Sequence, residues 1–188
     1  MSVVGPNRFT LADYPGFLPG LAVSVLLATA LYRNIGHRLG TKDQIAWLLV
    51  MSVGAIVSAT LTPGTEPFLH TSARATCDLS RLGLAPITTY LTLGTTSLNV
   101  ILFVPLGILI ALLRRSRATA FAIIGAALLP LAIESTQLVA TPLGRACQGA
   151  DVVDNMLGLA LGLAVGWSCV WISRIAAKQL HRGTSPTG

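Results

Sequence analysis

The sequence predicts an all-α, polytopic helical bundle that crosses a membrane about five times. Of the 188 residues, 53% are hydrophobic and only 11% are charged, whereas an average soluble domain carries about 25% charged residues. A helix rises about 1.5 Å per residue, so crossing about 30 Å of hydrocarbon takes about 20 mainly apolar residues. Five stretches approach this length, at residues 17–32, 45–62, 97–113, 118–139 and 152–173.

The first stretch, Phe17 to Tyr32, has a second interpretation as a cleaved signal peptide. Its apolar part would end at Leu27, and Ala28 to Ala30 would supply the small residues of the cleavage site. Only Arg8 precedes the stretch, however, and the basic segment after it would then have to be exported. A spanning helix is therefore the favoured interpretation.

Lysine and arginine predict the orientation, because short cytoplasmic loops keep positive charge. Nine of the 13 basic residues fall in three segments that alternate with the spans, at 33–42, 114–117 and 174–182. This bias predicts an external N-terminus, a cytoplasmic C-terminus and a multi-pass location in the cell membrane. The net charge of +6 then reflects topology and lipid contact, and nucleic-acid binding is not expected.

We interpret residues 17–173 as one transmembrane domain with a tail at each end. Residues 1–16 form an external tail, and residues 174–188 form a cytoplasmic one. The longest segment between spans is the external loop 63–96, whose Pro, Gly and Thr content leaves room for a short interfacial helix over 72–82. A loop of that length usually has a function or covers the bundle.

Two cysteines lie on the predicted external side, Cys77 in the long loop and Cys147 after the fourth span. That side is oxidising, so a disulfide could join them and hold the loop over residues 133–155. The alternative is two thiols whose Cα atoms stay more than about 7 Å apart.

Polar side chains gather in one segment of this apolar chain, "IESTQLVATPLGRACQGADVVDN", from Ile133 to Asn155. Glu134 lies inside the fourth span, and Gln137 follows three residues later on the same helix face. An unpaired acid at the centre of a bilayer costs about 2.5–3.5 kcal/mol on insertion scales. Glu134 therefore needs a partner, a proton or water, and either a function or an interhelical hydrogen bond explains it.

The second half of the segment holds Arg145, Asp151, Asp154 and Asn155. Asp151 stands where a helix N-cap is expected, which is a sufficient structural reason for it. Asp154 and Asn155 follow at three and four residues and share its helix face. We expect Arg145 to be the counter-ion of this row.

Small residues predict how the last span packs. Gly158, Gly162 and Gly166 repeat every four residues, a pattern that lets another helix approach closely. The neighbour would be the span that carries Glu134 or the third span, which has Asn99 near its external end. Pro105 and Gly107 in that third span are either packing residues or a loosening of the helix beside a site. Together these residues predict a polar pocket that opens to the outer leaflet.

Several kinds of chemistry are poorly supported by the sequence. None of His37, His70 and His181 lies near the polar segment, which argues against a zinc site, a histidine phosphatase and a Ser-His-Asp triad. Two or three acids beside one arginine are weak support for a site that binds a hard metal cation. No metal and no cofactor are predicted.

These residues, in this order, resemble the VanZ-like family of small bacterial membrane proteins. The resemblance covers about residues 99–166, or a little over a third of the chain. It rests on "NVILFVPLG" from Asn99 to Gly107 and then on Glu134, Gln137, Arg145, Asp151, Asn155, Gly158 and Gly162. Where the family usually has an acid three residues after the arginine, this chain has Gln148, and Asp154 supplies an acid just before Asn155.

The resemblance implies a role in the cell envelope, because the family's name comes from an accessory protein associated with teicoplanin tolerance. One hypothesis is a protein that contacts membrane lipids and binds a lipid-linked envelope molecule or a lipophilic glycopeptide, with Arg145 facing anionic head groups. A second is an enzyme that acts on a lipid-linked phosphate or sugar through Glu134, Asp154 and Arg145. In a third, the polar cluster only fastens helices. The sequence leaves the oligomeric state open.

Overall fold

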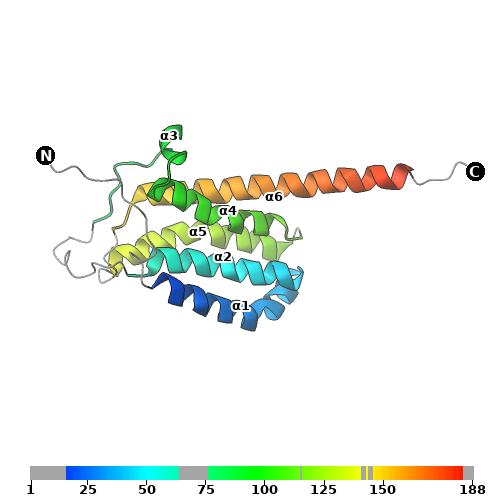
Figure 1. The fold of residues 1–188 in the computed structure, drawn as a ribbon, viewed down its shortest axis with the longest axis horizontal. Coiled ribbons are helices and arrows are strands. Elements are labelled where there is room, and N and C mark those ends of the chain that lie inside the picture. The colour runs from blue at the N-terminus through cyan, green and yellow to red at the C-terminus, as the bar shows by residue number, and fades with distance from the viewer. Residues whose placement is uncertain (1–15, 64–75, 115, 141–142, 144–145, 184–188) are drawn as a thin grey trace, which may run out of the picture.

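The computed structural model describes residues 16–63, 76–114, 116–140, 143 and 146–183, with the backbone alone for 180–183. Within these residues the chain forms six α-helices and no strand beyond one isolated β-bridge. The helices are α1 (Phe17–Leu39), α2 (Asp43–Leu61), α3 (Ile87–Tyr90), α4 (Thr95–Ala111), α5 (Arg117–Val139) and α6 (Gly149–Gly183). All but α3 run along a common direction (Figure 1).

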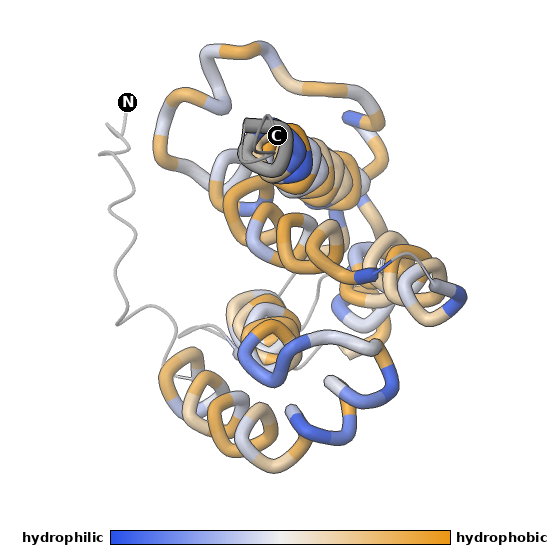
Figure 2. The backbone as a smooth tube through the Cα atoms, turned by 90° about the vertical axis from the view of Figure 1, so that its right-hand side faces the viewer, coloured by the Kyte–Doolittle hydropathy of each residue, from blue (hydrophilic) through white to orange (hydrophobic). Residues whose placement is uncertain are grey.

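The predicted all-α membrane bundle is confirmed. In the described part of the chain, α1, α2, α5 and α6 are long and apolar enough to cross a membrane by length and composition. The third predicted span, residues 97–113, corresponds to α4, which has 17 residues and is about 26 Å long. Figure 2 looks along the bundle and shows apolar residues over most of the helices. Large apolar side chains such as Leu26, Phe121 and Trp171 are exposed, as lipid contact requires.

Two helices are longer than their apolar stretches predict. The helix α1 continues past Tyr32 to Leu39 and stops at Gly40, whose φ of 61° suits glycine. The helix α6 continues ten residues past Ser173 to Gly183, is about 52 Å long, and projects beyond the other helices (Figure 1). The segment predicted as a C-terminal tail is therefore helical as far as Gly183.

The helices α4 and α6 run side by side with their backbones in close approach (Figure 1). A Cβ atom on Gly158 would lie 2.9 Å from the carbonyl carbon of Val100, and one on Gly162 would lie 2.9 Å from the Cα atom of Gly107. Gly166 meets Ile108 and Ala111 in the same way. The small-residue stripe thus faces the third predicted span, which is one of the two neighbours expected.

The helix α4 is continuous through Pro105. Gly107 does pack against α6, as its Cβ position 2.8 Å from the backbone nitrogen of Leu163 shows. Pro105 is exposed. A proline on the outer side of a helix can keep its missing hydrogen bond away from a packed interface.

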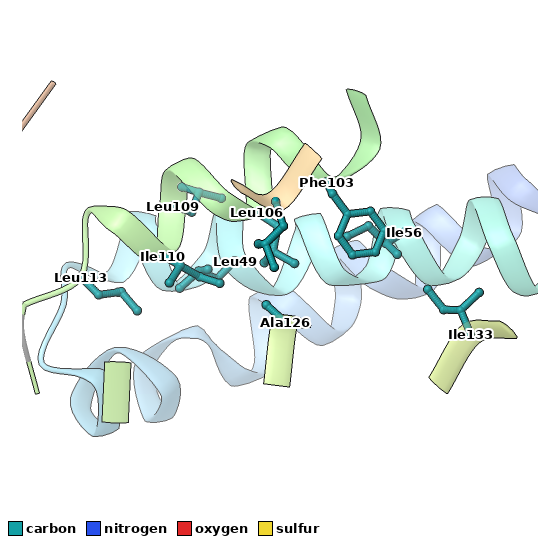
Figure 3. Close-up of a cluster of buried hydrophobic side chains, with 10 residues drawn as sticks. Leu49, Ile56, Phe103, Leu106, Leu109, Ile110, Leu113, Ala126 and Ile133 are labelled. Atoms are coloured by element: carbon teal, nitrogen blue, oxygen red, sulfur yellow. The ribbon is translucent and has the colours of Figure 1, made fainter. Parts of the chain in front are cut away.

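The apolar core lies between α2, α4 and α5 (Figure 3). This core includes Phe103 and Ile110 of α4, Ile56 of α2 and Ile133 of α5, and all four are almost fully buried. The helix α1 packs on α2 through two reciprocal pairs, Gly20 with Ser58 and Ser24 with Gly54. A groove of about 780 Å³ with almost entirely apolar walls remains between α1, α2 and α5.

Candidate functional site

The polar site lies at the end of the bundle where α4 and α6 begin, which we call the loop end. Residues 76–94 reach it from the side and are tied to the start of α6. Cys77 and Cys147 form a disulfide with their Cα atoms 4.6 Å apart. The backbone N–H of Asp78 donates to the carbonyl of Cys147 over 2.9 Å, and the N–H of Gly149 donates to the carbonyl of Asp78 over 2.8 Å. The loop is therefore held over the polar segment.

Residues 76–82 form no helix, so the short interfacial helix predicted there is wrong for the described residues. Their backbone makes a parallel bridge with Gln148 instead. The Asp78 carboxylate accepts a hydrogen bond of 2.9 Å from the N–H of Ser80. That bond lowers the pKa of Asp78, which keeps this exposed side chain ionised. The short helix in this loop is α3, further along the chain.

We expect Cys77→Ser to destabilise the bundle at its loop end. The disulfide joins residues 70 positions apart, and for a loop of that size the lost chain entropy corresponds to about 4 kcal/mol. Unfolding by dodecyl sulfate in mixed micelles, followed by circular dichroism, should show a lower midpoint. Reductant should lower the wild-type midpoint by a similar amount.

Cys169→Ser is the matched control, because Cys169 is an exposed free thiol and its loss should leave the midpoint unchanged. An unchanged midpoint for Cys77→Ser would show that the disulfide does not stabilise the loop end.

Asp154 is the most enclosed charged side chain of the site, with no exposed surface. The Arg81 guanidinium binds it with two hydrogen bonds, Nη2 to Oδ2 over 2.6 Å and Nη1 to Oδ1 over 3.2 Å. The Tyr90 hydroxyl donates to Oδ1 over 2.9 Å and accepts from the N–H of Ala85 over 3.1 Å. Both oxygens of the carboxylate are thus occupied by groups from the loop, as a buried charge requires.

The counter-ion of Asp154 is therefore Arg81, whereas the sequence had suggested Arg145. Arg145 lies outside the described residues. The hydrogen bond to Asp154 raises the pKa of Arg81, so this guanidinium stays charged at any pH at which the protein would be studied. Its side chain is 28% exposed, and its Nη1 also donates to the carbonyl of Gly83 over 2.9 Å.

Glu134 and Gln137 are both buried in the last turns of α5. The Glu134 Oε2 atom accepts a hydrogen bond of 2.7 Å from the backbone N–H of Gln148. The Gln137 Nε2 atom donates to the carbonyl of Thr60 on α2 over 2.9 Å. Glu134 therefore contacts the segment that leads into α6, and Gln137 joins α5 to α2.

The departure from the family pattern at Gln148 leaves this contact intact. The Gln148 side chain is exposed, and the contact with Glu134 is made by the backbone N–H of Gln148. Asp151 lies in the first turn of α6, which begins two residues before it, and is partly buried. An acid in that turn is favoured by the helix dipole.

Asn99 and Asn155 each carry one buried polar atom without a hydrogen-bond partner among the described residues. These atoms are the Nδ2 atom of Asn99 and the Oδ1 atom of Asn155. Asn155 is 1% exposed. Asn99 directly precedes Val100, which packs against Gly158, and Asn155 lies three residues before that glycine. One donor and one acceptor thus flank the close contact of α4 with α6.

The site has the groups for polar binding more than for metal binding. No group of three or more His, Cys, Asp or Glu side chains that could hold a metal ion occurs among the described residues. Asp154 is held by a cation and a phenol, which makes it a poor general base. Among the buried side-chain atoms that the structure describes, the Asn99 Nδ2 donor and the Asn155 Oδ1 acceptor have capacity left for a ligand.

The sequence model of the VanZ/LLP1 family matches residues 45–172, which is more than half of the chain. The match includes all of α4 and α5, most of α2 and α6, and the whole of the polar site. Searches of the curated proteins and of the solved structures found no match. The resemblance predicted from the motifs is confirmed, and the chain belongs to the VanZ/LLP1 family.

Proposed function

We propose that this protein binds the polar head of a lipid-linked envelope molecule at the outer face of the cell membrane. The observation that carries the proposal is the pair of unpartnered amide atoms, the Asn99 Nδ2 donor and the Asn155 Oδ1 acceptor. A buried polar atom without a partner costs about 1–3 kcal/mol. A ligand with a hydroxyl or amide group can accept from one and donate to the other, as sugars and peptides do.

Two independent features support placing the loop end outside the cell. The disulfide between Cys77 and Cys147 belongs in an oxidising compartment. The opposite end carries seven described basic residues of the three predicted cytoplasmic segments, namely Arg33, Arg38, Lys42, Arg114, Arg117, Arg174 and Lys178. Both features favour a multi-pass protein of the cell membrane with the polar site on the outer side.

The loop over this site favours binding over catalysis. Its disulfide, its β-bridge and the Arg81–Asp154 ion pair hold it in one position, and such fixed walls suit a site formed in advance of its ligand. An envelope molecule held in this way alters how lipophilic glycopeptides meet the membrane surface. The expected phenotype is therefore tolerance to a drug of the teicoplanin type.

The test is growth of a deletion strain under teicoplanin, complemented with the wild type or with single variants at equal abundance. We expect Asn155→Ala and Asn99→Ala to lose most of the protection, because each removes one of the two unpartnered groups. Gln179→Ala is the matched control, since this amide is exposed on the projecting part of α6. Protection by both asparagine variants at the wild-type level would contradict the proposal.

One further variant separates binding from the enzyme hypothesis. Glu134 is buried in α5, and an enzyme on a lipid-linked phosphate or sugar would use it as an acid or base. A catalytic Glu134 predicts that Glu134→Gln abolishes protection at normal abundance. In the binding proposal this variant keeps protection, because the amide oxygen still accepts from the N–H of Gln148.

A further inference from the structure

A pocket with polar, aromatic and apolar walls lies at the end of the bundle opposite the loop end, where α4 ends, α5 begins and α6 starts to project. It has a volume of about 520 Å³. Its polar and aromatic lining consists of Arg114, Ser116, Thr119, Trp167, Trp171 and Arg174. None of these residues belongs to the site at the loop end.

Two arginines give the pocket its formal charge. Arg114 and Arg174 are both exposed, and the one ion pair found among the described residues is that of Arg81 with Asp154 at the other end. Asp43 is the only described acid at this end, and it begins α2. Both arginines are therefore available to an anion from outside the chain.

The start of α5 adds to the positive charge. Ser116 caps this helix by accepting from the N–H of Thr119 over 3.2 Å, and both residues line the pocket. The positive end of the dipole of a 23-residue helix thus meets the same space as the two arginines. Helix N-termini and arginines are the groups that bind phosphate in proteins.

The remaining walls are apolar and aromatic. Trp167 and Trp171 lie one turn apart on α6 and are about half exposed or more, and Ile123 and Val170 continue the apolar lining. Tryptophan favours the boundary between lipid head groups and hydrocarbon. An occupant of this pocket therefore has both an anionic group and a hydrocarbon part.

We infer that this pocket binds an anionic phospholipid. Its phosphate lies between Arg114 and Arg174, and an acyl chain lies against Trp167 and Ile123. Basic pockets between membrane helices recognise acidic head groups in this way. The inference does not depend on the ligand proposed for the loop end.

The tryptophans provide the measurement. The chain has three of them, so Trp47→Phe leaves Trp167 and Trp171 as reporters. The purified full chain with this change, in detergent micelles, is titrated with phosphatidylglycerol or phosphatidylcholine carrying brominated acyl chains. We expect saturable fluorescence quenching at lower concentrations of the anionic lipid.

The double variant Arg114→Gln with Arg174→Gln should raise the half-quenching concentration of the anionic lipid about thirtyfold. Each basic residue contributes about 1 kcal/mol to the binding of an acidic lipid, and the variant removes two of them. The control is Arg38→Gln with Lys178→Gln, which removes equal charge from exposed positions outside the pocket. Its half-quenching concentration should equal that of the wild type. Three results would each overturn the inference: no preference for the anionic lipid, an equal loss in both double variants, or full displacement by soluble glycerophosphate.

Discussion

Gly162→Leu is expected to separate α4 from α6 and to prevent the bundle from folding stably. A Cβ atom at this position would lie 2.9 Å from the Cα atom of Gly107 and 3.0 Å from the backbone nitrogen of Ile108. These are backbone atoms, so no side-chain rotation can relieve the overlap. Overpacking a core costs about 1–3 kcal/mol, and occasionally more. We expect the stability lost in Gly162→Leu to be at or above the upper end of this range. The midpoint of unfolding by dodecyl sulfate should fall, and less protein should reach the membrane.

Gly125→Ala is the matched control for this prediction. Gly125 lies in the interior of α5, and a Cβ atom there has open space around it. Replacing glycine by alanine inside a helix stabilises it by about 0.5–1 kcal/mol. The midpoint should therefore stay the same or rise slightly. A Gly162→Leu protein as stable as Gly125→Ala would show that α4 and α6 do not need this close contact.

The packing of α6 could be predicted because it depends on a repeat within one segment. Gly158, Gly162 and Gly166 are spaced by four residues, so they must fall on one face whatever the rest of the chain does. The sequence did not decide between two neighbours for that face. That choice depends on the shape of α4, where Gly107 offers the matching surface.

The ends of the helices were harder to predict than their existence. Apolar runs mark where lipid begins and ends, and the backbone hydrogen bonds of α6 continue past that boundary to Gly183. Arg174 and Lys178 are good helix formers as well as cytoplasmic charges. Hydropathy alone therefore made α6 ten residues too short at its C-terminal end.

The partner of Asp154 could not be read from nearby sequence. Arg145 is nine residues away along the chain, whereas Arg81 is 73 residues away in a loop without periodicity. One signal did point to it, because a disulfide between Cys77 and Cys147 brings the segments after both cysteines together. Arg81 and Asp154 follow those cysteines by four and seven residues. Nothing comparable marked Tyr90.

Arg81→Leu is expected to destabilise the protein by about 3–5 kcal/mol, because it leaves a fully buried carboxylate without its cation. The Tyr90 hydroxyl remains as a donor, but one neutral hydrogen bond replaces little of a bidentate ion pair. Asp154→Asn should cost less, about 1–3 kcal/mol, because the 28% exposed Arg81 side chain can still reach water. Unfolding midpoints in dodecyl sulfate measure both losses.

The double variant Arg81→Leu with Asp154→Asn decides whether the pair acts through the buried charge. Removing both partners of a buried ion pair is often far less harmful than removing one, so the double variant should be more stable than Arg81→Leu alone. Arg38→Leu serves as the control for losing an exposed arginine and should change the midpoint little. If the two single losses simply add, Arg81 and Asp154 contribute independently, and the loop is held over the site by its disulfide and β-bridge.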